Sequence, residues 1–242
     1  MKALILAGGR GSRLQEFTET KNKCMYNFRG RPLITYSLDY ACGAGVSEIL
    51  IVVSYLAESI INVLGNAYKG IPIKYVIQWE RKGLVHAMET SQGAIGGDDF
   101  MLFLADEVLA NPRHVDMVKC FQEQKVFTLC GVVPVKDTSQ IKKTYAVIYN
   151  ERDSRIYRLI EKPRAILNNL MGTGNCIFRN AIFDYVPYTP INQVRGEKEL
   201  PDLIQCAVDD GMLVQLFGVG TRYVNVNTVD DIGQLESGWP ED

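Results

Sequence analysis

The sequence predicts an α/β fold: a Rossmann-like, mixed and mostly parallel sheet flanked by helices, with a small β-rich insertion. In the first half of the chain, hydrophobic runs of strand length alternate with segments of helical period, as in sheets connected by helical crossovers. After Pro134 this alternation gives way to a hairpin pattern, which we assign to the insertion. A chain of 242 residues with 47% hydrophobic and 22% charged residues can bury a core of that kind.

The elements of the first half follow from the hydrophobic runs and the segments between them. The opening run, residues 2–7, is typical of a buried strand, because it is shorter than the apolar part of a signal sequence and ends in two glycines. We predict strands near 2–7, 48–54, 71–77, 100–105 and 127–134, and helices near 32–44, 56–67, 84–93 and 112–124.

The second half is predicted to close the sheet. Residues 145–149 and 155–160 flank a turn-prone Asn-Glu-Arg-Asp-Ser segment, as the two strands of a hairpin do. Thr228 precedes two aspartates like the cap of a last helix, where its oxygen can accept an orphan backbone N–H. The other elements are a strand near 171–178, helices near 179–186 and 199–210, and strands near 213–218 and 222–226. Since there are no repeats and no linker-like run, we expect one domain over residues 1–242.

Charge, cysteine spacing and hydropathy exclude several classes of protein. The longest apolar stretches, such as residues 49–53, fall far short of the roughly 20 residues that cross a bilayer, so we expect no membrane partner. A net charge of −2 argues against a nucleic-acid partner. Six cysteines without a Cys-x-x-Cys pair, and only two histidines, support neither a zinc site nor a disulfide framework. These features fit a reducing cytoplasm.

Positive charge gathers at the start of the chain, around a glycine-rich loop. Residues 1–31 hold seven basic and two acidic residues, a local charge of +5. Gly8, Gly9 and Gly11 directly follow the first strand, so backbone N–H groups can approach phosphate oxygens there without a Cβ in the way, and Arg13 adds a charged fork. The loop lacks the Gly-Lys-Ser/Thr ending of a Walker motif, and leucine stands where a dinucleotide fingerprint needs its third glycine. The loop therefore predicts phosphate binding of another kind.

This opening resembles that of the sugar-1-phosphate nucleotidylyltransferases, the family of glucose-1-phosphate thymidylyl- and uridylyltransferases. The family pattern is Leu-Ala-Gly-Gly-x-Gly-x-Arg-Leu, followed by Thr, Lys and a basic residue before Pro. It is matched in order by Gly8, Gly9, Gly11, Arg13, Leu14, Thr18, Lys23, Arg31 and Pro32. The resemblance implies that residues 1–134 mainly bind nucleotide, that 135–210 mainly bind sugar, and that 211–242 supply closing strands and a helix.

The resemblance also implies roles for residues on the nucleotide side. Arg13 and Lys23 hold the departing pyrophosphate, and Gln78 and Gly83 correspond to the base-recognition positions of the uridylyl- and thymidylyltransferase branch. An amide can donate and accept at once against a pyrimidine edge, which favours UTP or dTTP. His86 is expected to be structural. The residues expected to wrap the nucleotide phosphates are Leu6, Ala7, Gly8, Gly9, Gly11 and Ser12.

Transfer of a phosphoryl-type group spreads negative charge over oxygens, which a divalent cation usually neutralises. Asp106 follows the fourth strand at its carboxyl end, where open α/β sheets place their sites, and it matches the family's metal-binding aspartate. The second family ligand falls on Asn225 or Asn227, and which of them serves stays open. Mg²⁺ tolerates a neutral ligand, because it takes only one or two carboxylates and keeps several waters. Glu107 is expected to be solvated.

The sugar side is implied by three further matches. Glu161 and Lys162 belong to the family's Glu-Lys-Pro, whose lysine contacts the sugar phosphate, and Glu197 is the first glutamate of a Gly-Glu-x-Glu-x-x-Asp stretch that binds the sugar. Gly174 and Asn175 fall where the family reads sugar hydroxyls. Ala146 stands where the glucose-type enzymes often have glycine, so the identity of the sugar stays open.

We therefore predict an enzyme that joins a nucleoside triphosphate to a sugar 1-phosphate, with in-line attack on the α-phosphorus and release of pyrophosphate. Mg²⁺ is the expected cofactor, and a homo-oligomer is compatible with the sequence. Two alternatives stay open. One is a cytidylyltransferase acting on a non-sugar phosphate or phosphonate, which would share the loop and the cation site. The other is a catalytically silent nucleotide-binding regulator, suggested by the two asparagines at the cation site.

Overall fold

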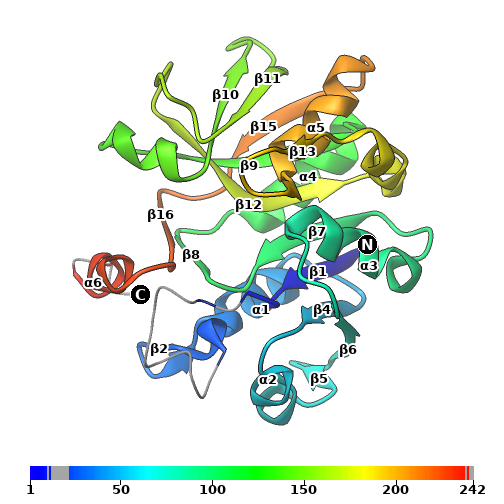
Figure 1. Ribbon diagram of the computed structural model, residues 1–242, viewed down its shortest axis with the longest axis vertical. Helices are drawn as coiled ribbons and strands as arrows, with labels where there is room; N and C mark the ends of the chain where they lie inside the picture. The colour runs from blue at the N-terminus through cyan, green and yellow to red at the C-terminus, as the bar shows by residue number, and fades with distance from the viewer. Residues whose placement is uncertain (10, 12–21, 238, 240–242) are drawn as a thin grey trace.

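A mixed sheet of eight strands runs through the molecule in the order β15-β9-β12-β7-β1-β4-β6-β5 (Figure 1). The computed structural model describes residues 1–9, 11, 22–237 and 239. The strands are β1 (Lys2–Leu6), β4 (Ile49–Val53), β5 (Ala67–Tyr68), β6 (Ile71–Ile77), β7 (Phe100–Leu104), β9 (Thr128–Pro134), β12 (Leu170–Phe178) and β15 (Val214–Gly218). The predicted strands of the sheet are all present, within about two residues of their predicted ends.

Parallel pairing dominates one half of the sheet and antiparallel pairing its middle. Strands β7, β1, β4 and β6 pair in parallel, as do β9 and β15. Strand β12 lies between β7 and β9 and is antiparallel to both. The predicted mixed, mostly parallel α/β fold is therefore confirmed. Because β1, β4, β6 and β7 run the same way, their carboxyl ends meet at one edge of the sheet.

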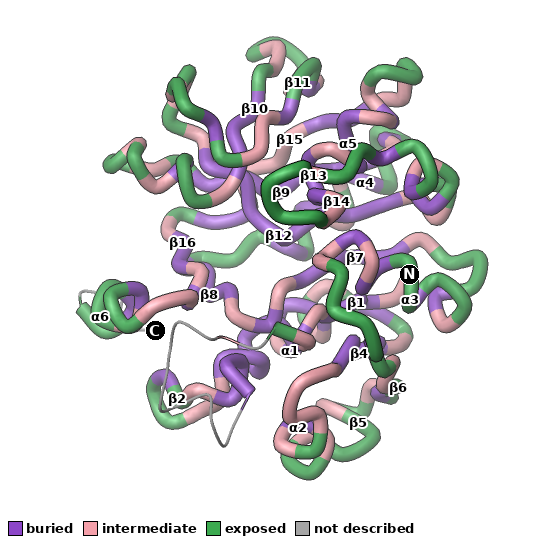
Figure 2. The backbone as a smooth tube through the Cα atoms, in the orientation of Figure 1, coloured by how far each residue is buried: buried purple, intermediate pink, exposed green. Residues whose placement is uncertain are grey.

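Helices cover both faces of the sheet. Residues of β1 alternate between two buried clusters: Ala3 and Ile5 pack in one, Leu4 in the other. Helices α1, α2, α4 and α6 contribute to the first cluster, and α3 and α5 to the second. Figure 2 shows the buried backbone concentrated along the central strands. The α-helices are α1 (Ile34–Gly43), α2 (Ala57–Leu64), α3 (Leu84–Ile95), α4 (His114–Gln124), α5 (Leu200–Asp209) and α6 (Val229–Glu236).

Two features of the second half match their predictions, and one helix differs in type. The hairpin forms as β10 (Tyr145–Tyr149) and β11 (Ile156–Glu161), which lie at the end of the molecule opposite α2 and β5 (Figure 1). Thr228 and Asp231 form a reciprocal capping box at the start of α6. The helix predicted near 179–186 is the 3₁₀-helix η4 (Asn180–Tyr188), and Pro187 inside it cannot donate an α-helical hydrogen bond.

Short elements escaped prediction because each has too few residues to show a period. They are the 3₁₀-helices η2 (Lys23–Met25) and η3 (Thr138–Lys143) and the strands β2 (Asn27–Phe28), β3 (Arg31–Pro32), β8 (Glu107–Ala110), β13 (Ile191–Asn192) and β14 (Glu197–Lys198). Strand β8 pairs antiparallel with β16 (Arg222–Asn225), which sets Asn225 opposite Glu107. This pairing brings the C-terminal part of the chain to the carboxyl edge of the sheet. No helix in the described part of the chain has the length and apolar character to cross a membrane.

Candidate active site

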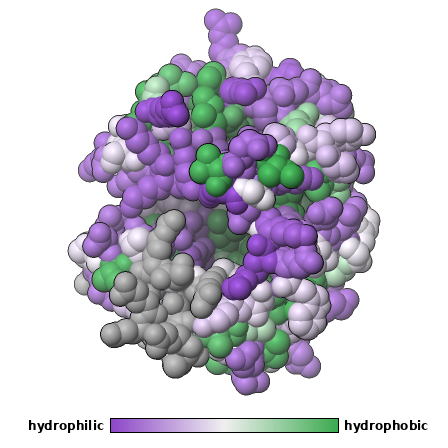
Figure 3. Space-filling model, in the orientation of Figure 1, coloured by the Kyte–Doolittle hydropathy of each residue, from purple (hydrophilic) through white to green (hydrophobic). Residues whose placement is uncertain are grey.

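A cavity of about 810 Å³ opens at the carboxyl edge of the sheet, between the glycine-rich loop and the hairpin. The face of the molecule drawn in Figure 3 is hollowed near its centre. The predicted site residues that line the cavity are Gly9, Gly11, Lys23, Glu161, Lys162, Gly174, Glu197, Asn225 and Asn227. The predicted site residues Leu6, Ala7, Gly8, Gln78, Gly83, Asp106, Ala146 and Asn175 are not among those that line it. Ser12 and Arg13 lie outside the described residues.

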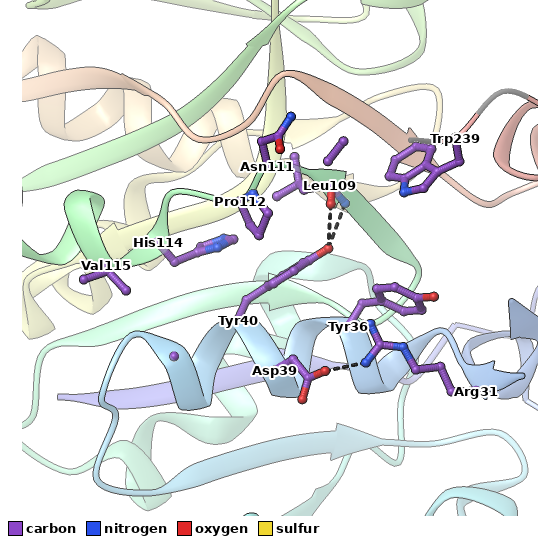
Figure 4. Close-up of a pocket in the computed structure, with 12 residues that line it drawn as sticks. Arg31, Tyr36, Asp39, Tyr40, Leu109, Asn111, Pro112, His114, Val115 and Trp239 are labelled. Carbon is purple, nitrogen blue, oxygen red and sulfur yellow. Dashed lines mark hydrogen bonds and ion pairs between the residues drawn. The ribbon is translucent and has the colours of Figure 1, made fainter. Parts of the chain in front are cut away.

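A second cavity, of about 500 Å³, lies between α1 and the segment that follows β8 (Figure 4). Tyr40 crosses its floor, where the phenol oxygen accepts from the N–H and donates to the carbonyl of Leu109. Arg31 packs over the ring of Tyr36 and pairs with Asp39 at its side. None of the predicted site residues that the structure describes lines this cavity, so the larger cavity is the candidate site.

The base of the glycine-rich loop is held by Asn22, which the sequence analysis missed. The Asn22 Nδ2 donates to the carbonyl oxygens of Ala7 at 3.1 Å and Tyr55 at 2.8 Å, and its Oδ1 accepts from the Cys24 N–H at 3.1 Å, capping η2. Asn22 is only 1% exposed. One buried amide therefore joins the end of β1, the turn after β4 and the helix that carries Lys23.

Gly8 is tightly enclosed in the turn that follows β1. A Cβ at Gly8 would lie 3.2 Å from Gln78 Oε1 and 3.3 Å from Ser54 Cβ, so any side chain here would press on both neighbours. The Gln78 Nε2 lies 2.9 Å from His86 Nδ1 and donates to the Gly83 carbonyl at 3.2 Å. The amide predicted to read the base thus packs beneath the loop, with its donor directed at the start of α3.

Lys23, Asp106 and the two asparagines meet at one end of the cavity. The buried Lys23 ammonium pairs with the Asp106 carboxylate and donates to Asn227 Oδ1 at 2.8 Å. Asn227 Nδ2 in turn donates to Asn225 Oδ1 at 2.7 Å. The Asp106 carboxylate, which follows β7, and the Asn227 amide oxygen, which follows β16, are therefore directed at a single positively charged group, although they stand more than 100 positions apart in the chain.

These oxygens suit a hard cation. Within residues 1–9, 11, 22–237 and 239, no three His, Cys, Asp or Glu side chains gather as a metal cluster. The site at Asp106 instead offers one carboxylate and neutral amide oxygens, a set that Mg²⁺ accepts when water and phosphate oxygens complete its shell. Asn227 is the better placed of the two, because its Oδ1 and an Asp106 oxygen lie on the same Lys23 ammonium, whereas Asn225 Oδ1 lies on the Asn227 amide.

The prediction that Glu107 is solvated was wrong. Glu107 is 2% exposed, and its carboxylate accepts from the Tyr223 hydroxyl at 2.5 Å, the Gly174 N–H at 3.0 Å and Asn175 Nδ2 at 2.7 Å. Burial raises the pKa of Glu107 to about 8, while the hydrogen bond from Tyr223 acts in the opposite direction. The sequence offered little sign of this, because its partners lie 67 to 116 positions away.

Asn175 belongs to the same buried network, on the side away from the cavity. Its Oδ1 lies 2.9 Å from His114 Nε2, and its Nδ2 binds Glu107, so both ends of the amide are engaged. His114 stacks on Tyr40, and burial lowers the pKa of the imidazole to about 4. Ala146 is also buried, paired with Ile160 in the hairpin.

The other end of the cavity carries charged groups from the hairpin and from the segment before α5. Lys162 adopts a left-handed backbone conformation, with φ of 44°, and its N–H donates to the Thr144 carbonyl at 2.7 Å. Arg195, which the sequence analysis missed, pairs with Glu161 at 2.5 Å and Glu199 at 2.6 Å. Burial raises the pKa of both glutamates, and Arg195 opposes that rise.

Glu197 lies against the start of α3. A Cβ at Gly83 would lie 2.7 Å from Glu197 Oε2 and 2.9 Å from its Cβ, and Gly83 has a positive φ of 91°. Space and backbone conformation together therefore favour glycine at this position. The contact joins the start of α3 to β14, so the positions predicted to bind base and sugar touch each other.

Comparisons with known proteins identify the family of the chain. A family model described as nucleotidyl transferase matches residues 2–240. The chain is 33% identical to the UTP–glucose-1-phosphate uridylyltransferase of Haloferax volcanii, over 100% of this chain and 93% of that protein. It is 29% identical to a glucose-1-phosphate thymidylyltransferase of Streptomyces antibioticus over 96% of this chain, and it spans 64% of that protein's length.

The fold is shared with a solved structure of UDP-glucose pyrophosphorylase complexed with UDP-glucose. The TM-score is 0.88 at 21% identity, and the alignment covers 97% of this chain and 96% of that one. The family model spans nearly the whole chain, and the Haloferax relative is more than 30% identical along all of it. The family membership predicted from the glycine-rich opening is thereby confirmed: the chain belongs to the nucleotidyl transferase family, among the sugar-1-phosphate nucleotidylyltransferases.

Proposed function

We propose that the protein joins a nucleoside triphosphate, UTP or dTTP by preference, to a sugar 1-phosphate, giving a nucleoside-diphosphate sugar and pyrophosphate. The observation that carries this proposal is the division of one cavity into two charged ends. Lys23, Asp106 and Asn227 meet beside the glycine-rich loop, while Glu161, Lys162 and Arg195 face the same space from the hairpin side. Two phosphorylated substrates can therefore enter one cavity from opposite ends.

In this proposal the residues of the chain mainly position the reactants and neutralise charge. Lys162 orients the sugar phosphate so that one of its oxygens attacks the α-phosphorus in line. Lys23, together with Arg13, stabilises the negative charge of the departing pyrophosphate. The P–O bond to pyrophosphate breaks as the new P–O bond forms, and no covalent enzyme intermediate is required.

Mg²⁺ fits the oxygens at the nucleotide end. Asp106 and Asn227 would hold it, with Asn225 orienting the Asn227 amide through the 2.7 Å hydrogen bond. The cation would supply charge neutralisation on the phosphate oxygens. The six cysteines are all free thiols, which agrees with a reducing compartment, and we propose the cytoplasm.

The test is pyrophosphate release measured over a matrix of triphosphates and phosphate acceptors, with Mg²⁺ and with excess chelator. UTP and dTTP with hexose 1-phosphates are expected to give turnover that chelator abolishes. Turnover confined to CTP with a non-sugar phosphate or phosphonate would instead identify a cytidylyltransferase. Nucleotide binding without turnover in any pair would identify a silent regulator, and either result would overturn the proposal.

A further inference from the structure

Glu107 stands out among the buried groups because the proposed chemistry does not use it. Its Oε1 accepts from the Tyr223 hydroxyl at 2.5 Å and from the Gly174 N–H at 3.0 Å, and its Oε2 accepts from Asn175 Nδ2 at 2.7 Å. These donors come from β16 and β12, whereas Glu107 begins β8. The carboxylate therefore joins three elements at the point where they border the cavity.

The contact with Gly174 shapes part of the cavity wall, the stretch Gly172–Gly174. The register of β12 with β9 shifts between Gly172 and Cys176, so the Gly174 N–H turns to Glu107 rather than to the neighbouring strand. A Cβ at Gly174 would lie 2.3 Å from Leu104 Cγ and 3.0 Å from Glu107 Oε1. The wall is thus pressed against the carboxylate with no room for a side chain between them.

The same wall is in direct contact with the sugar end of the cavity. The Tyr145 hydroxyl donates to the Thr173 carbonyl at 3.0 Å, and its ring lies 2.2 Å from where a Cβ on Gly172 would stand. Tyr145 is paired with Glu161 across the hairpin. A continuous series of contacts therefore leads from Glu107 through the wall and Tyr145 to the residues beside Lys162.

We propose that Glu107 is a positioning residue for the sugar 1-phosphate: it fixes the Gly172–Gly174 wall, and through Tyr145 it sets the place of the residues that bind the sugar side. This inference rests on the proposed function. The geometry of the acceptor oxygens matters here, since two buried N–H donors and a hydroxyl converge on them. Glu107 acts through its neighbours and takes no part in the bond changes.

Two substitutions separate the reach of the Glu107 side chain from its chemical group. Glu107→Asp keeps a carboxyl group but draws it back from Gly174 and Asn175, and it is expected to raise the KM for sugar 1-phosphate about tenfold or more, with the KM for triphosphate changed less than about threefold. Glu107→Gln keeps an oxygen for Tyr223 and Gly174. Its NH₂ group takes the place of the other oxygen and needs an acceptor. The Asn175 Oδ1 can accept from it if the Asn175 amide rotates and His114 changes tautomer, because His114 Nδ1 has no partner among the described residues. Glu107→Gln is therefore expected to keep the sugar-phosphate KM within about threefold.

Asp99→Ala is the matched control. Asp99 accepts from the Asn180 N–H at 3.0 Å and pairs with Arg179 at 2.7 Å, at the opposite ends of β7 and β12 from Glu107. The Asp99→Ala substitution is expected to lower the melting temperature and to leave the KM values for triphosphate and sugar 1-phosphate unchanged. Should Glu107→Asp fail to fold, Thr173→Val takes its place, since it loosens the same wall by removing the 2.9 Å bond to the Gly131 carbonyl, and the same selective rise is expected.

An unchanged sugar-phosphate KM in the folded Glu107→Asp variant, or an equal rise in both KM values, would overturn the inference. So would a Glu107→Gln variant as impaired as Glu107→Asp, because an acceptor oxygen in its original place would then not be enough to hold the wall. If the wild-type protein released no pyrophosphate from any substrate pair, the proposed function itself would fail. The wild-type measurement therefore separates the two failures.

Discussion

Lys23 and Asn227, 204 positions apart in the chain, are joined by a 2.8 Å hydrogen bond from Nζ to Oδ1. The same ammonium pairs with Asp106, so the oxygens that we propose for Mg²⁺ are bridged by a positively charged side chain. A divalent cation on those oxygens would lie close to the ammonium, and the two charges would repel each other. The affinity for the cation is therefore coupled to the position of Lys23.

Replacing Lys23 by Met should separate its two effects. Without the ammonium, Mn²⁺ in the absence of nucleotide should bind about tenfold more tightly or better, because repulsion is removed. The kcat/KM should nevertheless fall by about 10²–10³, since the pyrophosphate loses a preorganised charge. Calorimetry measures the Mn²⁺ affinity and steady-state kinetics measure kcat/KM. The control is Lys119→Met, at an exposed position on α4. Equal Mn²⁺ affinity in variant and wild type would contradict the coupling.

The two asparagines should differ in their response to an added charge. Asn227→Asp places a second carboxylate where the ammonium now contacts an amide oxygen, so the Mg²⁺ concentration for half-maximal turnover should fall by about tenfold. Asn225→Asp should change it by less than about threefold, because the Asn225 oxygen is bonded to Asn227. Asp106→Asn should abolish Mg²⁺-dependent turnover with the circular dichroism intact. If Asn225→Asp lowered the Mg²⁺ concentration for half-maximal turnover more than Asn227→Asp did, Asn225 would be the ligand.

The residues predicted correctly as neighbours are those whose signal is local. The glycine loop follows a strand directly, Asp106 closes another strand, and parallel strands bring such ends to one edge whatever the intervening sequence. The family resemblance then supplied Lys23 and Lys162, which stand beside short motifs. Local motifs and the family resemblance were together enough to predict that these groups lie near one edge of the sheet.

Asn22, Glu107 and Arg195 could not be found this way, because each of them also contacts a partner distant in the chain: Tyr55, Tyr223 and Glu161 respectively. In the sequence, Glu107 is an ordinary charged residue that follows a strand. Its burial depends on the pairing of β8 with β16 and on the register shift in β12. A four-residue strand such as β8 shows no period of its own. The burial of Asn175 could not be predicted either, because its side chain contacts His114 and Glu107, which are both distant in the chain.

His114 gives the fold a calculable sensitivity to acid. Burial lowers its pKa from 6.5 to about 4, so between those values the unfolded chain binds a proton that the folded chain does not. Stability should therefore fall as the pH drops through that window, by up to about 3 kcal/mol. His114→Phe keeps a ring stacked on Tyr40 and should remove this part of the pH dependence. Urea unfolding measures the free energy of unfolding at pH 7 and at pH 5. If the difference between the two values were the same in the variant as in the wild type, His114 would be excluded as the cause.

Arg195 should stabilise the proposed sugar end of the cavity by pairing with two glutamates. Its guanidinium pairs with Glu161 and Glu199, and Arg195→Ala would leave these two carboxylates facing each other without their shared cation. The KM for sugar 1-phosphate should rise about 10- to 100-fold, with little change for the triphosphate. Arg195→Lys should restore only part of the affinity for sugar 1-phosphate, because an ammonium is more strongly hydrated and lacks the rigid, planar array of donors of a guanidinium. Arg152→Ala, exposed in the hairpin turn, is the control. Equal losses for both substrates would mean that Arg195 supports the fold and has no selective role at the sugar end.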